Sequence, residues 1–277
     1  MAAPPIKPVQ DNSPQGPGRP EHPAAETGIE NRIYDDYEAL SRAAAALFTE
    51  GAREALRDHQ DFRVALSGGK TPARMLALLA DAPLRDEVPW SHVQVFWGDE
   101  RWVPLDDERS NAGQARRQLL DRVPLTADQV SPMGCGASPA AAALAYEEQI
   151  RRLFGNRPPR FDLIFLGLGT EGHTASLFPG SDLIAETQRW VREVPYGPAG
   201  LSRVSFTPLL INQAATVAFL VSGANKADTV RAIQQGPRQP EHYPAQSIRP
   251  MNGRLIWLLD RAAAACLNGS SESPIPQ

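Results

Sequence analysis

The chain has 277 residues, of which 42% are hydrophobic, enough for one large α/β domain or two modest ones. The net charge is −4, whereas nucleic-acid-binding proteins usually have an excess of basic residues. No apolar run approaches the length that spans a bilayer. Two cysteines, Cys135 and Cys266, offer neither a disulfide framework nor the spacing of a metal site. We therefore expect a soluble, cytoplasmic protein that binds a small molecule, with no nucleic acid or membrane as partner.

The two ends of the chain differ in composition from its middle. Residues 1–27 and 268–277 are rich in proline and polar residues and cannot bury enough apolar surface to offset the cost of ordering. We predict flexible tails there and a single α/β domain over 28–267.

Helical and strand patterns alternate between the two tails. Strands separated by helices predict a mostly parallel, Rossmann-like open sheet with helices on both faces. Ligands of such sheets bind beyond the carboxyl ends of the strands, so the polar loops that follow strands are expected to converge. In chain order the pattern predicts a helix over 34–58, a strand over 62–66, a helix over 71–80, a strand over 93–97, helices over 111–121 and 140–154, strands over 161–166 and 216–221, a helix over 225–235, a strand over 255–259 and a helix over 261–267.

The first polar loop, SGGKTP over 67–72, combines glycine N–H groups, hydroxyls, a lysine and the start of a helix, which together suit an anion. Thr71 is expected to cap that helix, with Pro72 at its first position. The loop is not a Walker A motif, because Val64 stands where that motif requires glycine. A phosphate-binding loop is favoured over a plain glycine-rich turn.

The second polar loop, GDERWVP over 98–104, follows the strand 93–97. A cluster of acidic and basic residues is, in isolation, more often a solvated turn. Here the neighbouring tryptophans would partly desolvate Asp99 and Arg101 and strengthen their interactions, which favours a functional role.

The third polar loop lies in FDLIFLGLGTEGHTASLFPG over 161–180 and contains the pattern GxGxxG. A dinucleotide site would need a long helix after these glycines, whereas the run Phe-Pro-Gly at 178–180 stops any helix early. The polar setting of His173 favours a catalytic histidine over a structural one.

Two later cations complete the candidates. Lys226 follows a strand and a glycine turn at the start of a helix, the arrangement of the first loop, although it could equally be an ordinary exposed helix lysine. Together with Arg203, it would add positive charge to backbone donors around a phosphate dianion.

Five motifs, taken together and in this order, resemble the family of 6-phosphogluconolactonases over about residues 34–267. The first loop is shared with glucosamine-6-phosphate deaminases, and the run HTASLFP after the third loop's glycines favours the lactonases. The family pattern usually has Asp at position 171 and Ser at position 70. The motifs are SGGKTP (67–72), GDERWVP (98–104), GLGTEGHTASLFPG (167–180), SRVSFTPLLIN (202–212) and FLVSGANKA (219–227).

The resemblance implies hydrolysis of 6-phospho-D-glucono-1,5-lactone to 6-phosphogluconate in the pentose phosphate pathway, without metal or organic cofactor. His173 would activate a water, with Glu171 or Asp99 orienting the imidazole. Arg101 or glycine N–H groups would stabilise the oxyanion. The resemblance places substrate binding at Ser67, Gly68, Gly69, Lys70, Thr71, Gly169, Arg203 and Lys226.

Two other functions stay open: a sugar-phosphate isomerase or deaminase, and a non-catalytic sugar-phosphate sensor on the same fold. The expected assembly is a monomer or a homodimer. The role of Lys70 and the choice between Glu171 and Asp99 as partner of His173 are also left open.

Overall fold

The computed structural model describes residues 28–134, 136–155, 157–195 and 197–267. Both predicted tails, 1–27 and 268–277, and Cys135 lie outside the described residues. No helix in the described part of the chain is both long and apolar enough to cross a membrane.

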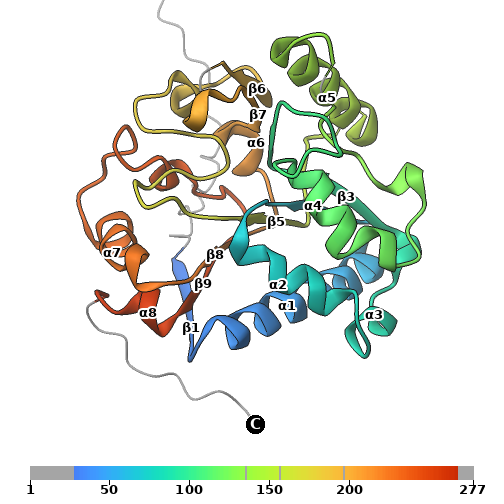
Figure 1. Cartoon of the computed structure of the whole chain (residues 1–277), viewed down its shortest axis with the longest axis horizontal. Helices are drawn as coiled ribbons and strands as arrows, with labels where there is room; N and C mark the ends of the chain where they lie inside the picture. Colours follow the sequence, from blue (N-terminus) through green and yellow to red (C-terminus); the bar gives the residue numbers. More distant parts are fainter. Residues whose placement is uncertain (1–27, 135, 156, 196, 268–277) are drawn as a thin grey trace, which may run out of the picture.

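The described residues form a large sheet of six strands in which every neighbouring pair is parallel. Its middle strands are buried on both faces, as expected of a parallel sheet covered by helices. The predicted mostly parallel α/β sheet is therefore confirmed (Figure 1). The strand order is β1 (Ile29–Tyr34), β9 (Arg254–Asp260), β8 (Thr216–Val221), β5 (Leu163–Leu166), β2 (Phe62–Leu66) and β3 (Val93–Trp97).

Alternate residues of the strands supply two separate cores, one on each face of the large sheet. In β8, Val217 and Phe219 join one apolar cluster, and Ala218 and Leu220 join the other. The first cluster is covered by α5 (Pro139–Phe154), α6 (Pro208–Ile211), α7 (Ala227–Gln235) and α8 (Arg261–Ala264). The second is covered by α1 (Tyr37–Asp58), α2 (Lys70–Leu79) and α4 (Asn111–Gln118), with the short α3 (Leu84–Glu87) beside α1 and α2.

A small antiparallel sheet, which the sequence patterns did not predict, packs against α5. Its strands are short, and β4, which lies in the predicted second polar loop, contains only charged residues. The register places Asp99 opposite Ser205 and Arg101 opposite Arg203. The strand order is β4 (Asp99–Arg101), β7 (Arg203–Phe206) and β6 (Val191–Val194).

Several predicted helix boundaries are wrong by a few residues. The helix expected from residue 34 begins at Tyr37, because the preceding residues form the edge strand β1 and Asp36 caps the helix by accepting from Ala39 N at 2.8 Å. The helix expected from residue 71 begins at Lys70. Its N-cap is Gly69, with φ of 103°, so Thr71 is not the cap.

The helix predicted over 140–154 is confirmed as α5, whereas the other three are shorter than expected. The helix over 111–121 ends at Gln118, and the one over 261–267 ends at Ala264. The segment expected to be helical from residue 225 begins as a single 3₁₀ turn, Ala224–Lys226, before α7.

Candidate active site

A cavity of about 440 Å³ lies where β2, β3, β5 and β8 end, at the carboxyl edge of the large sheet. Its size suits a small-molecule ligand. Loops that are far apart in the sequence therefore meet at one place, as the strand pattern predicted. Every predicted site residue except Glu171 lines this pocket: Ser67, Gly68, Gly69, Lys70, Thr71, Asp99, Arg101, Gly169, His173, Arg203 and Lys226.

His173 is held against its own loop by a carboxylate and a glycine. Its Nδ1 lies 2.7 Å from Glu171 Oε1, and its carbonyl oxygen accepts from Gly169 N at 2.8 Å. A Cβ on residue 169 would lie 2.0 Å from His173 Nδ1, so only glycine leaves room for the ring there. With Nδ1–H donating to Glu171, Nε2 is the nitrogen that can accept a proton.

Glu171, rather than Asp99, is therefore the carboxylate in contact with His173, although Glu171 is outside the pocket lining. Burial opposes ionisation of Glu171. Hydrogen bonds from its own N–H, from His173 and from Thr170, together with the His173 charge, nevertheless hold its pKa below the usual value. The side chain is ionised at neutral pH and suited to support an imidazolium.

Asp99 has different partners. Its Oδ2 accepts from Ser176 Oγ at 2.6 Å and lies 3.8 Å from Arg203 Nη1, while Asn111 Nδ2 lies 3.4 Å from Oδ1. The Asp99 side chain is 8% exposed. Asp99 thus contacts the histidine loop through Ser176, the start of α4 through Asn111, and the cation Arg203 of β7.

The glycine-rich loop before α2 presents an uncapped helix N-terminus to the pocket. Gly69 makes no side-chain cap, and Tyr37 Oη donates to Lys70 O at 2.8 Å, which fixes the first turn from outside. A Cβ at Gly68 would lie 1.8 Å from Asn111 Oδ1, so this residue also has to be glycine. Free N–H groups at a helix start are suited to a phosphate.

Lys226 reaches the same pocket from a second glycine turn. Gly223, with φ of 102°, donates its N–H to both carboxylate oxygens of Asp260, at 2.9 and 3.1 Å. Burial lowers the pKa of Lys226, and the Glu171 charge opposes that shift. Lys226 thus lines the pocket half-buried, whereas Lys70 is exposed there and has no ion pair to any described residue.

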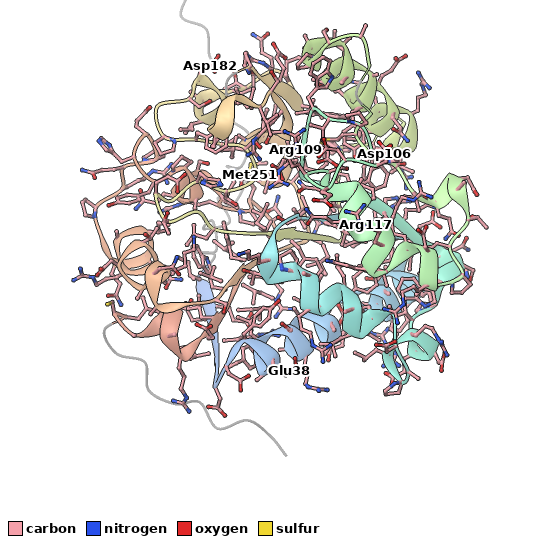
Figure 2. All side chains as sticks on the ribbon, viewed as in Figure 1. Glu38, Asp106, Arg109, Arg117, Asp182 and Met251 are labelled. Atoms are coloured by element: carbon pink, nitrogen blue, oxygen red, sulfur yellow. The ribbon has the colours of Figure 1, made fainter. Side chains whose placement is uncertain are left out.

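Two arginines project from the small sheet. Arg203 has a side chain that is 13% exposed, and burial lowers its pKa, while Asp99 opposes the shift. Arg101 Nη1 donates to the carbonyl oxygen of Arg109 at 2.5 Å, in the loop before α4 where Asp106 also lies (Figure 2). The Nε atoms of both site arginines are buried and have no hydrogen-bond partner among the described residues.

Sequence reasoning missed Asn111 and the residue that positions it. The carboxylate of Glu100, in β4, accepts from the N–H groups of Asn111 and Ala112 at 2.7 and 2.8 Å and from Ser110 Oγ at 3.0 Å. Burial raises the pKa of Glu100, and these backbone donors oppose the shift. The positive end of the helix dipole favours a carboxylate at the start of α4. Glu100 lies about ten residues before that helix, so the sequence alone does not show that the two are in contact. Other lining residues missed from the sequence are Pro72, Gly167, Leu168, Ala175, Ser222 and Asn225.

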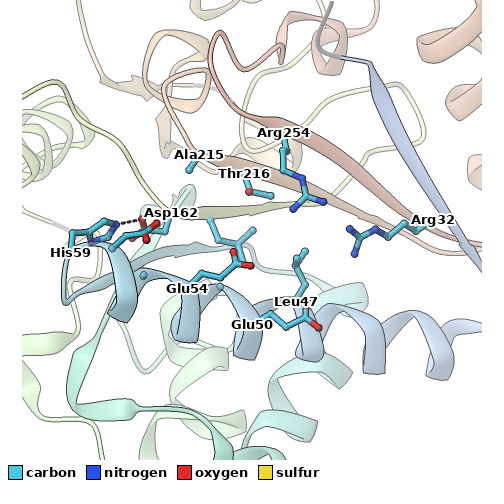
Figure 3. A pocket seen from close by; sticks show the side chains of 13 residues that line it. Arg32, Leu47, Glu50, Glu54, His59, Asp162, Ala215, Thr216 and Arg254 are labelled. Carbon is cyan, nitrogen blue, oxygen red and sulfur yellow. Dashed lines mark hydrogen bonds and ion pairs between the residues drawn. The ribbon is translucent and has the colours of Figure 1, made fainter. Parts of the chain in front are cut away.

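A second, smaller cavity of about 130 Å³ lies at the amino edge of the same sheet, beside α1. His59 Nε2 lies 2.9 Å from Asp162 Oδ1 at one end of this cavity, and Arg32 and Arg254 lie at the other (Figure 3). No group of three or more His, Cys, Asp or Glu side chains in the described ranges is arranged to hold a metal ion.

Fold and pocket together define an α/β protein with a pocket suited to a small anionic ligand at the carboxyl edge of a parallel sheet, next to a histidine–carboxylate pair. The model of the glucosamine-6-phosphate isomerases/6-phosphogluconolactonase family matches residues 35–257. The chain belongs to this family.

Individual relatives agree with this assignment. The 6-phosphogluconolactonase of Synechocystis sp. is 39% identical over 228 residues, which cover 81% of this chain and 92% of that protein. The crystal structure of the devB protein has a TM-score of 0.80 at 32% identity and covers 86% of this chain and 99% of its own. The 6-phosphogluconolactonase from Trypanosoma cruzi has a TM-score of 0.78 at 29% identity and covers 90% and 100%.

Proposed function

We propose that the protein hydrolyses 6-phospho-D-glucono-1,5-lactone to 6-phospho-D-gluconate, a step of the oxidative pentose phosphate pathway. Similarity to proteins named 6-phosphogluconolactonase, at up to 39% identity over most of the chain, supports this activity. The observation that carries the proposal within the molecule is the His173–Glu171 pair, which adjoins the pocket that also holds the glycine loop, Arg203 and Lys226.

The chemistry proposed for His173 is general-base catalysis. Nε2 takes a proton from a water as its oxygen attacks the lactone carbonyl carbon, and Glu171 stabilises the imidazolium that forms. The carbon–oxygen bond of the ring then breaks, and the imidazolium returns the proton to the departing ring oxygen. The reaction yields a carboxylic acid and a free hydroxyl and needs no redox partner.

Oxyanion stabilisation is assigned to Arg101 and to N–H groups of the glycine loops. Buried donors already in place when charge develops on the carbonyl oxygen contribute more than donors in water. The remaining polar residues, including Asp99, hold the side chains and loops around the substrate.

The 6-phosphate lies far from the reacting carbon, and its binding fixes the lactone relative to His173. Two cations of the pocket, Arg203 and Lys226, supply positive charge, and the start of α2 supplies N–H donors. Lys70, exposed at the pocket, adds a third cation. We assign the phosphate and its flanking contacts to Ser67, Gly68, Gly69, Lys70, Thr71, Gly169, Arg203 and Lys226.

Parallel assays of the purified protein test this function. One follows lactone hydrolysis by coupled oxidation of the 6-phosphogluconate formed, and the other follows ammonia release from glucosamine 6-phosphate. Hydrolysis above the spontaneous rate without deamination is the expected result. Deamination alone would support the isomerase alternative, and ligand binding without either reaction would support a sugar-phosphate sensor. Single-domain organisation over 28–267 and a monomeric or homodimeric state remain predictions, for limited proteolysis and light scattering to test.

A further inference from the structure

Ser176, three residues after His173, connects the histidine loop to the small sheet by both its side chain and its main chain. Its hydroxyl donates to Asp99 Oδ2 at 2.6 Å, and its N–H donates to Ser205 Oγ at 3.2 Å. Asp99 and Ser205 are register partners on neighbouring strands, β4 and β7. Both serine side chains are completely buried, so water does not compete for these hydrogen bonds.

Ala175, which lies between Thr174 and Ser176, has a strained backbone conformation. Ala175 has φ of 47°, a left-handed conformation that a non-glycine residue keeps only when its surroundings impose it. On one side, Thr174 Oγ1 donates to Gly167 O at 2.8 Å, and Leu177 N closes the turn onto Thr174 O at 2.9 Å. On the other side, the two hydrogen bonds of Ser176 and the fully buried Leu177 hold the turn.

These bonds connect the loop after β5 of the large sheet to the small sheet. His173 and Glu171 belong to the loop after β5 of the large sheet, whereas Arg203, at the pocket, belongs to the small sheet. Asp99, the acceptor of the Ser176 hydroxyl, also lies 3.8 Å from Arg203. Ser176 therefore fixes the loop of the histidine relative to the strand that carries an arginine of the pocket.

We propose, on the basis of the lactonase function above, that Ser176 is a positioning residue for the hydrolysis. Its two hydrogen bonds hold the strained turn at Ala175, and with it the His173 imidazole, where the activated water meets a lactone whose phosphate is bound by other segments. A displacement of about 1 Å at a reacting group can lower a rate by about 10². Ser176 acts through His173 and not by touching the substrate.

The variant Ser176→Ala tests this proposal, because it removes the hydroxyl and keeps the backbone bond to Ser205. We expect kcat for the lactone to fall by roughly 10-fold to 100-fold. KM and the inhibition constant of inorganic phosphate should stay within about twofold of the wild-type values, since the phosphate contacts remain. Ser41→Ala is the matched control: Ser41 is also completely buried, and its hydroxyl donates at 2.7 Å to Tyr37 O within α1.

The outcome separates positioning from a purely structural role. If kcat of Ser176→Ala matches that of the Ser41→Ala control, or if KM alone rises, the proposal is wrong. If Ser176→Ala does not fold, Ser205→Ala decides instead. It removes the acceptor of the Ser176 N–H and should lower kcat by about threefold or more, and an unchanged kcat would overturn the proposal. Absence of hydrolysis by the wild-type protein would instead contradict the proposed function itself.

Discussion

The two edges of the large sheet hold cavities of opposite character. At the amino edge, basic side chains around the 130 Å³ cavity lie against carboxylates: His59 lies 2.9 Å from Asp162 (Figure 3), and Arg254 lies 2.9 Å from Glu30. At the carboxyl edge, cations line a cavity of about 440 Å³, and Lys70 has no ion pair to a described residue. Paired charges hold a fold together, whereas cations around an open cavity are suited to an external anion.

Left-handed backbone is present at both edges: Gln60, with φ of 80°, follows α1 at the amino edge, and several such residues lie at the carboxyl edge. Gly69 and Gly223 have positive φ values and bring two helix starts to the carboxyl edge, and the strained Ala175 lies there as well. In parallel sheets, the loops at that edge carry the ligand-binding residues. The substitutions below use the amino edge as a control for the carboxyl edge.

Removal of the proposed base should have the largest effect. We expect His173→Ala to lower kcat for lactone hydrolysis by about 10² or more, because the water loses its general base. The inhibition constant of inorganic phosphate should change little, since the phosphate contacts remain. Steady-state kinetics corrected for spontaneous hydrolysis measure both quantities. The amino-edge variant His59→Ala is the matched control, and a kcat for His173→Ala equal to that of the control would refute the base assignment.

Neutralising the partner of the base should have the next largest effect. We expect Glu171→Gln to lower kcat roughly 10-fold to 30-fold, because the imidazolium loses the carboxylate that stabilises and orients it. Glu171→Asp, which keeps the charge, should retain most of the activity. Equal rates for Glu171→Gln and the wild type would show that the carboxylate does not support His173.

Glu171 also gives a test in pH. Because its pKa is lowered in the folded protein, the stability that it contributes is present at neutral pH and is lost as the pH falls through that lowered pKa. Urea unfolding should therefore show wild type more stable than Glu171→Gln at pH 7, with the two curves converging below about pH 4. Curves that stay equally far apart at both pH values would argue against the ionised carboxylate as the cause.

Removal of a cation that is proposed to bind the phosphate should weaken substrate binding. We expect Lys226→Ala to raise KM about tenfold, the equivalent of one charge-assisted contact, with kcat within about twofold. Arg254→Ala removes an exposed cation at the amino edge and should leave KM unchanged. An unchanged KM for Lys226→Ala would place this lysine outside the substrate site.

Much of this site could be predicted because its loops have local signals. Glycines that follow an apolar run indicate a strand end, and parallel strands bring their carboxyl ends to one edge, so SGGKTP and the histidine loop were expected to meet. The choice between Glu171 and Asp99 was beyond the sequence, because both carboxylates stand near His173 or a strand end. The distance from Glu171 to the imidazole is set by the turn between Gly169 and His173, and that turn is defined only by the three-dimensional structure.

The small sheet was missed for a different physical reason. Its strands have three or four residues, and Asp-Glu-Arg in β4 has neither apolar alternation nor β-branched residues, so nothing local favours a strand. Tertiary contacts hold β4 as a strand: Glu100 binds the start of α4, and Asp99 binds Ser176. The same long-range bonds explain why Asn111 was not expected at the pocket, and why Ser176 was not expected to contact the small sheet beside it.

The smallest expected effect belongs to the amino edge. Burial raises the pKa of Asp162, so its ionisation costs stability as the pH rises, and the donors His59 and Arg63 N–H offset that cost. We expect His59→Ala to lower the free energy of unfolding at pH 7 by about 0.5 kcal/mol, the usual value for a partly exposed pair. The difference should vanish below about pH 4, where Asp162 is protonated and no longer needs a cationic or donor partner. Urea unfolding at the two pH values measures it, and a change in kcat or KM of this variant would show that the two edges of the sheet are coupled.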